Sequence, residues 1–164
     1  MLTEPKLVHR EKLHFVAIQA KVRREDIPVT LPQLIPEIIN WLVDNNILSY
    51  GRPFFEYLQI ENNQLLVNVG VLLQNEIKGN QRIIGGYFET GTYAIITYIG
   101  NYSHLFNAHI ALESWIEKNN LQEKKEILTN GLKWGSRTEF YITDPQKELN
   151  PDNWVTDVVF LLND

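Results

Sequence analysis

One aspartate stands out because it interrupts a run of apolar residues. Asp157 lies in segment 155–162 (VTDVVFLL), where both alternating faces of a strand are otherwise largely apolar. Such a strand is covered on both faces, and an ionised carboxylate there is costly unless it is paired. Two interpretations stay open. In the first, Asp157 lines a cleft with Val155 and Val159 and supplies negative charge for a cationic ligand, while the alternate residues Val158, Phe160 and Leu162 pack on the helices. In the second, Asp157 lies near a strand edge and faces water.

Aromatic side chains form a second group with the chemistry to hold a cation. We expect Tyr141 to lie near the strand of Asp157, across an antiparallel hairpin. An aromatic box around a delocalised cation would contribute roughly 0.5–2 kcal/mol for each ring. The alternative is that these rings belong to the core, as most strand aromatics do. The expected members of the box are Phe55, Tyr57, Tyr93, Tyr98, Tyr141 and Trp154.

Glu139 offers the one route to catalysis that the sequence suggests. It precedes Tyr141 by two residues and therefore shares its face of a strand. If its carboxylate lay within a few ångströms of Asp157, one of the two pKa values would rise and that group could act as an acid. The alternative is a glutamate on the surface of a strand.

Other kinds of site find little support in the sequence. The chain has no cysteine, which excludes thiolate catalysis and zinc–cysteine sites. His104 and His109 lie about 140° apart around a helix, which makes them poor metal ligands. No serine-centred glycine elbow or phosphate-cradling glycine pattern is present. We therefore expect no metal and no cofactor.

The composition sets the class of protein. The 164 residues are 44% hydrophobic and 11% aromatic, which is enough for one domain with a substantial core. A formal charge of −5 gives no basic footprint for nucleic acid. No apolar run approaches the roughly 20 residues that span a bilayer, and the first residues do not resemble a signal peptide. The expectation is a cytoplasmic protein that binds neither membranes nor nucleic acid.

The elements that must position these side chains occur twice. Three segments return in order, displaced by 74, 84 and 89 positions (115 − 41, 141 − 57 and 158 − 69). A repeat of this length predicts two units related by a pseudo-two-fold axis, with a cleft between them. The paired segments are 40–47 with 114–121, 51–58 with 135–142, and 67–73 with 156–162.

Each unit has the pattern of a β-α-β-β motif. Residues 12–73 and 91–162 form the half-repeats, and the polar, glycine-bearing residues 74–90 link them. Apolar residues at helical spacing predict one amphipathic helix in each half. Alternating segments joined by turn residues predict the strands. The predicted fold is α+β, a single domain over residues 1–164 with a curved antiparallel sheet and both helices on one face.

The repeat also pairs the candidate site residues. Tyr57 and Tyr141 are repeat mates, and the mate of Asp157 is Asn68. A cleft with a carboxylate on one side and a neutral amide on the other would orient a monocation. Gly70 shares the strand face of Asn68, where it either leaves room for a flat ligand or marks a β-bulge.

The ordered set of motifs resembles one known family. Residues 91–102 (GTYAIITYIGNY), 112–121 (LESWIEKNNL), 141–145 (YITDP) and 154–158 (WVTDV) are similar to segments of the GyrI-like effector-binding domain. The resemblance extends from Phe15 to Leu162. That domain also forms the ligand-binding part of AraC- and MerR-type multidrug-responsive regulators. Its last strand usually carries a glutamate where this chain has Asp157, a departure that keeps the charge and shortens its reach.

The resemblance implies three functions, which stay open at this point. The first is a stand-alone module that binds small hydrophobic or cationic aromatic compounds, for recognition or sequestration. The second is a hydrolase that detoxifies reactive strained-ring natural products, with Asp157 or Glu139 as acid or base. The third is an inhibitor that acts on a macromolecular partner. Only about eleven residues precede the first expected strand, too few for a DNA-binding helix-turn-helix. We therefore expect any regulatory role to need a separate regulator or other protein partner.

Overall fold

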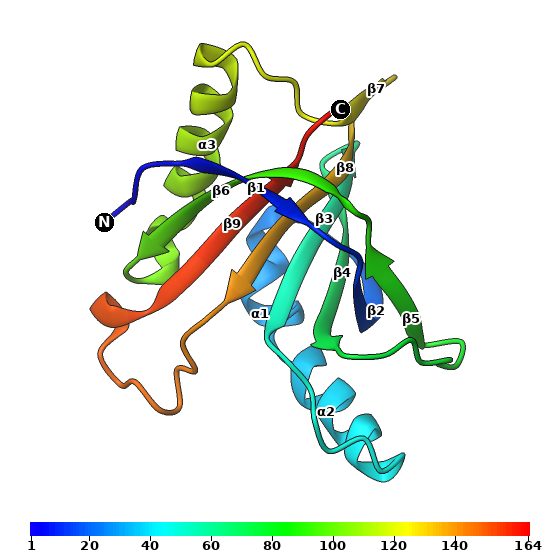
Figure 1. Ribbon diagram of the computed structural model, residues 1–164. Coiled ribbons are helices and arrows are strands. Elements are labelled where there is room, and N and C mark those ends of the chain that lie inside the picture. The colour runs from blue at the N-terminus through cyan, green and yellow to red at the C-terminus, as the bar shows by residue number, and fades with distance from the viewer.

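The computed structural model describes residues 1–164 and contains one nine-stranded antiparallel sheet with three α-helices (Figure 1). The predicted α+β class is therefore confirmed. The strands are β1 (Lys6–Arg10), β2 (Leu13–Val22), β3 (Pro53–Glu61), β4 (Gln64–Leu73), β5 (Ile83–Phe88), β6 (Gly91–Ile99), β7 (Lys125–Leu128), β8 (Gly131–Tyr141) and β9 (Val155–Leu161). The helices are α1 (Ile27–Thr30), α2 (Leu34–Asp44) and α3 (Phe106–Lys118).

The strand order confirms the internal repeat. Neighbouring strands follow the order β1-β6-β9-β8-β3-β4-β2-β5, with β7 paired to β8. The first unit, β2-α2-β3-β4, thus meets the second, β6-α3-β8-β9, where β3 pairs with β8. At this junction Phe55 is opposite Glu139, and these two residues are repeat mates (139 − 55 = 84). The pairs Glu56–Asn68 and Phe140–Asp157 have the same register in the two halves, which confirms Asn68 as the mate of Asp157.

The ends of the two long helices repeat as well. Asn46 follows α2 with φ 60°, and Asn120 follows α3 with φ 56°. Asparagine tolerates this left-handed conformation better than most residues, and it lets the chain turn back towards the helix. The amide of the following residue then donates to the carbonyl five positions earlier, Ile47 to Leu42 and Leu121 to Ile116.

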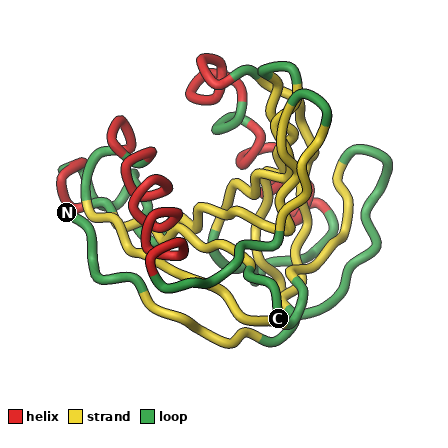
Figure 2. Tube along the Cα trace, turned by 90° about the horizontal axis from the view of Figure 1, so that it is seen from above, coloured by secondary structure: helices red, strands yellow, loops and turns green.

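The helices cover two separate areas of one face of the sheet, here called the helix face (Figure 2). Leu34, Ile38 and Leu42 of α2 pack with β2 and β4. Ala108, Leu112 and Ile116 of α3 pack with β6 and β9. The prediction that Val158, Phe160 and Leu162 face a helix is confirmed. The middle of the helix face, where β3 meets β8, lies between these two areas.

The opposite face, here called the inner face, is closed by the curl of the sheet. β5 and β6 lie towards opposite ends of the strand order, yet only Glu89 and Thr90 separate them in sequence. The sheet must therefore curl until its two sides approach each other. Aromatic rings fill the space enclosed by the curl, with centroid separations of 4.9–5.9 Å; they are Phe15, Phe54, Phe88 and Phe140.

Several elements lie outside the segments that the sequence predicts as strands and helices. The residues before the first expected strand include β1, which pairs with β6. The predicted link at 74–90 contains β5, and the short helix α1 precedes α2. β8 begins at Gly131 and is preceded by its partner β7. None of the three helices has the length and hydropathy needed to span a bilayer.

Candidate ligand-binding site

A buried carboxylate occupies the middle of the helix face. Glu139 on β8 is only 6% exposed. Its Oε1 accepts hydrogen bonds from the hydroxyls of Tyr57, at 3.1 Å, and Tyr141, at 2.7 Å. Its Oε2 lies 2.7 Å from Nε2 of His109. One carboxylate thus joins two central strands and a helix, and we call these four residues the Glu139 cluster.

The position of each member follows from local periodicity. Strand alternation places Arg137, Glu139 and Tyr141 on the same face of β8. Phe55 of β3 is paired with Glu139. Tyr57 lies two residues further along β3 on the same face, so its hydroxyl reaches the same carboxylate. His109 belongs to the buried stripe of α3, which also contains Ala108, Leu112 and Ile116.

Aromatic rings surround the Glu139 cluster. Phe55 packs edge-on against Tyr141, with a centroid separation of 5.0 Å. Tyr102 lies against Tyr141 at 5.5 Å and against Trp154 at 4.6 Å. Three more rings contact His109 at centroid separations of 5.6–6.4 Å; they are Tyr57, Phe106 and Phe160. A carboxylate among ring faces combines the two features that attract a delocalised organic cation.

The two tyrosines that bind Glu139 remain hydrogen-bond donors at neutral pH. Burial raises the pKa of the Tyr57 and Tyr141 hydroxyls well above the ordinary value of 10.0, and the negative charge of Glu139 raises both further. A protonated phenol donates its hydrogen to the carboxylate, whereas a phenolate would repel it. The site therefore presents one acidic side chain with two neutral hydroxyl donors.

These raised pKa values predict a loss of stability in alkali. Below about pH 10 both phenols are protonated in the folded and unfolded chain alike. Above that pH the unfolded chain releases protons that the folded chain retains, so the free energy of unfolding falls as the pH approaches the folded-state pKa values. Urea unfolding followed by circular dichroism across this range should show the decline, and it should be shallower in Tyr57→Phe/Tyr141→Phe. The same slope for both proteins would contradict the assignment.

The structure brings several of the predicted site residues together. Phe55, Tyr57, Glu139 and Tyr141 lie in or against the Glu139 cluster. Trp154 joins them through Tyr102, and its indole Nε1 donates to the carbonyl of Glu148. Tyr98 lies on the helix face but packs with α3, and its hydroxyl donates to the carbonyl of Asn101.

Three other predicted site residues lie on the inner face. Asp157 accepts a hydrogen bond of 2.7 Å from the hydroxyl of Thr97 on β6. Asn68 donates to Glu56 and accepts from Gln19. Tyr93 packs with the phenylalanine rings that fill the inner face, and its hydroxyl donates to the carbonyl of Glu89.

The expectation that Asp157 shares a cleft with Tyr141 and Glu139 needs correction. Strand alternation turns Val158 towards the helices and Asp157 away from them. Asp157 is therefore separated from Glu139 by the thickness of the sheet. The two carboxylates do not form an acid–base pair, and a ligand contact of Asp157 stays a prediction.

Gly70 has a packing role that neither earlier interpretation described. A side chain at this position would place its Cβ 2.2 Å from the Val16 carbonyl oxygen and 2.7 Å from the Phe54 ring. The space beside Gly70 is thus filled, and no flat ligand fits there. Gly70 also keeps regular register with both neighbouring strands, so it is not a β-bulge.

Sequence reasoning missed His109, Tyr102 and Phe106 as parts of the site. The signal for His109 was available, because it falls among the apolar residues of the buried stripe of α3. A histidine in such a stripe needs a polar partner on the surface that it covers. The identity of that partner depends on which strand passes beneath the helix, which local periodicity does not give.

Residues 3–162 match the family model described as the GyrI-like small molecule binding domain. None of the curated proteins compared with this chain has a matching sequence.

Solved structures share the fold at low sequence identity. An EcmrR chain from an EcmrR–DNA complex superposes with a TM-score of 0.71 and 20% identity over 98% of this chain. This chain spans 57% of the length of that EcmrR chain. SAV2435 bound to tetraphenylphosphonium has a TM-score of 0.64 and 9% identity, with 98% of this chain and 94% of that one covered. A hydrolase from Listeria innocua has a TM-score of 0.59 and 13% identity, with 98% and 92% covered.

Proposed function

We propose, on the premise that this chain belongs to the GyrI-like small-molecule-binding domain family, that it binds hydrophobic aromatic cations at the Glu139 cluster. The observation that carries the proposal is the buried Glu139 carboxylate among aromatic rings. SAV2435 supports it, since that protein of similar fold was solved with a lipophilic cation, tetraphenylphosphonium, bound to it. Recognition or sequestration of several such compounds follows from the same site, because ring faces and one charge impose few shape requirements.

Specificity for cations follows from the charge balance of the site. A cation that contacts Glu139 replaces hydrogen bonds from neutral tyrosine hydroxyls with a direct electrostatic attraction in a poorly solvated environment. Aromatic rings add cation–π attraction without competing for water. A neutral compound of the same shape would gain only the apolar contact.

Ligand access requires side chains above the carboxylate to move. Glu139 is nearly covered, whereas Phe106, which stacks on His109, is 55% exposed. Phe106 lies at the first residue of α3, where a change of side-chain rotamer does not disturb the sheet. We infer that a ligand first displaces Phe106 and then replaces one of the hydrogen-bonded partners of Glu139.

The proposal is tested by titrating a fluorescent lipophilic cation, with tetraphenylphosphonium as competitor. Glu139→Gln removes the charge while keeping the size of the side chain and its ability to accept hydrogen bonds from the tyrosines. We expect the dissociation constant to rise about tenfold or more, since two opposite unit charges about 4 Å apart near a protein surface attract each other by about 4 kcal/mol.

Asp157→Asn is the matched control. It removes a carboxylate from the inner face, where Thr97 is its partner, and we expect wild-type affinity. The reverse result, with affinity lost in Asp157→Asn and kept in Glu139→Gln, would move the cation site to the inner face. Equal affinity of all three proteins would refute a role for either charge.

A second function, hydrolysis of an electrophilic substrate, is favoured by one specific observation. Glu139 is within hydrogen-bond distance of two hydroxyls and an imidazole. This array contains a carboxylate that can accept a proton and phenols that can donate one. The similarity to a hydrolase from Listeria innocua shows the shared fold.

Turnover separates this function from binding alone. Incubation with a strained-ring electrophile, followed by mass analysis, should show a product one water heavier if the site is hydrolytic. The rate should fall in Glu139→Gln and stay unchanged in Asp157→Asn. Wild-type protein that produces no more product than Glu139→Gln would leave binding as the function of the site.

A further inference from the structure

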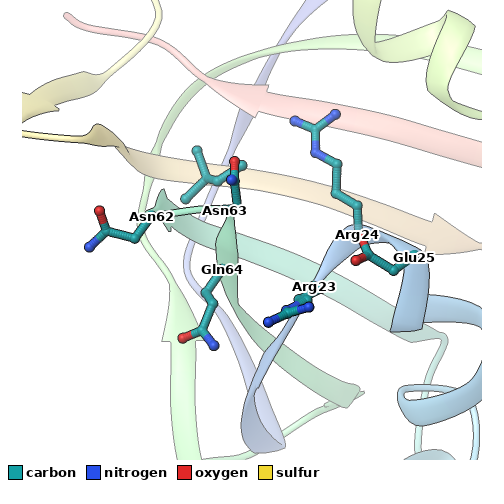
Figure 3. Close-up of a pocket in the computed structure, with 7 residues that line it drawn as sticks. Arg23, Arg24, Glu25, Asn62, Asn63 and Gln64 are labelled. Carbon is teal, nitrogen blue, oxygen red and sulfur yellow. The ribbon is translucent and has the colours of Figure 1, made fainter.

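A pocket lies outside the Glu139 cluster, between the end of β2 and the β3–β4 turn (Figure 3). It has a volume of about 410 Å³, which falls within the roughly 300–1,000 Å³ of pockets that hold small organic ligands. Its polar lining residues are Arg23, Arg24, Glu25, Asn62, Asn63 and Gln64, and Ile60 supplies its apolar part. We call it the arginine pocket.

The charge of the arginine pocket is unbalanced. Arg82 and Arg137 each pair with a carboxylate elsewhere in the chain, whereas no carboxylate lies within ion-pair distance of Arg23 or Arg24. Glu25 supplies one negative charge against two positive ones. The pocket is therefore locally positive.

The amide side chains of the pocket are held by a tight turn. Asn62 and Asn63 have φ values of 53° and 64°, as a two-residue hairpin turn of this twist requires. The backbone N–H of Asn62 also donates to the backbone carbonyl of Asn130, which connects this turn to the β7–β8 turn. Carboxamide NH2 groups from such a turn can add hydrogen bonds to an oxyanion already attracted by the guanidinium groups.

The two arginines have different positions in the pocket. In Figure 3 the Arg23 side chain extends towards Gln64, whereas Arg24 extends in the other direction. The Arg24 guanidinium lies 5.3 Å from the centroid of the Phe106 ring on α3. Arg23 is thus the principal anion contact, and Arg24 adds positive charge from a position that the aromatic ring supports.

The second half of the repeat lacks this chemistry. The 3₁₀ turn Arg24–Asp26 that follows β2 corresponds to the turn Tyr102–His104 that follows β6. The first residue is an arginine in one half and a tyrosine in the other, and the Tyr102 ring packs 4.6 Å from Trp154. The arginine pocket is therefore found only in the first half of the repeat and does not follow from the fold that the two halves share.

We propose that the arginine pocket binds a small organic anion, through a phosphate or carboxylate group held by Arg23 and the turn amides. Guanidinium groups bind both kinds of oxyanion through paired hydrogen bonds. The volume accommodates more than one such group, and Ile60 offers a contact for an apolar or aromatic portion. The arginine pocket adjoins the Glu139 cluster where Arg24 contacts Phe106, but its lining residues are different ones and the proposal does not depend on the function proposed for the cluster.

Isothermal titration calorimetry with phenyl phosphate tests the proposal. Wild-type protein should bind one equivalent, and Arg23→Gln/Arg24→Gln should bind about tenfold more weakly or not at all, because charge-assisted hydrogen bonds are lost. Arg52→Gln is the matched control, since Arg52 is exposed and forms no ion pair. It should bind as the wild type does, and so should Glu139→Gln.

The remaining probes separate the contributions of charge and ring. Benzoate should bind at the same site, and phenol, which lacks the anionic group, should not. No saturable binding of phenyl phosphate, or equal affinity in wild type and Arg23→Gln/Arg24→Gln, would overturn the proposal. Phenol that binds as tightly as phenyl phosphate would overturn anion recognition. Tighter binding of phenyl phosphate in Glu139→Gln, which removes a carboxylate that repels an anion, would show that the ligand occupies the Glu139 cluster instead.

Discussion

Replacing Arg137 with alanine is expected to lower the free energy of unfolding by about 3–5 kcal/mol. The Arg137 guanidinium donates to both carboxylate oxygens of Glu123, at 2.6 and 2.7 Å, and to Glu113 of α3 at 3.0 Å. It also lies 4.1 Å from the Phe160 ring centroid. Glu123 is only 7% exposed, so the substitution leaves a buried carboxylate without its partner. Urea unfolding followed by circular dichroism measures the effect.

Arg82→Ala provides the comparison for this stability prediction. Arg82 pairs with Glu37 through two hydrogen bonds, but both side chains are well exposed. Exposed ion pairs contribute little because water and salt screen them, so unfolding of this variant should stay close to that of the wild type. If the two variants were equally stable, the buried pair of Arg137 with Glu123 would not contribute to stability as predicted here.

The second large effect is expected for Gly70→Ala, which should destabilise the protein by about 3 kcal/mol through overpacking. The new methyl group would lie 2.2 Å from a backbone carbonyl oxygen of β2 and 2.9 Å from Cβ of Ala17. Backbone atoms in a central part of the sheet cannot move aside as a flexible side chain can. Thermal unfolding and urea unfolding should both report the loss.

Gly91→Ala is the matched substitution at the start of β6. There the nearest atom to a new Cβ is Cδ1 of Leu161, at 3.2 Å, which belongs to a side chain that can adjust. We expect its stability to differ little from that of the wild type. A Gly70→Ala protein as stable as Gly91→Ala would show that the sheet around Gly70 is looser than the structure indicates.

The repeat was readable from the sequence because it rests on local rules. Asn46 and Asn120 end equivalent helices, and the displacements of 84 and 89 positions are those that the strand register shows. Strand alternation also identified Val158 as a residue that faces a helix. These features depend on neighbours a few positions apart, for which sequence patterns are informative.

The position of the buried carboxylate was not readable in the same way. Alternation tells which residues share a face, but not where on that face two helices leave the centre uncovered. Asp157 therefore seemed the better candidate, although its alternation with Val158 places it on the inner face. The Glu139 cluster depends on the pairing of β3 with β8 and on the strand beneath His109, both of which are long-range. The same reason explains why β1, which pairs with β6 far along the chain, was missed.

A crystal structure of this protein with tetraphenylphosphonium bound would decide where the cation lies. We predict that its phenyl rings pack among Phe55, Tyr141 and Phe106, with the phosphonium centre close to the carboxylate of Glu139. The Phe106 side chain should differ in rotamer from the one described above. A cation bound on the inner face beside Asp157, or one bound with no contact to Glu139, would contradict the assignment of this carboxylate as the ligand's counter-charge.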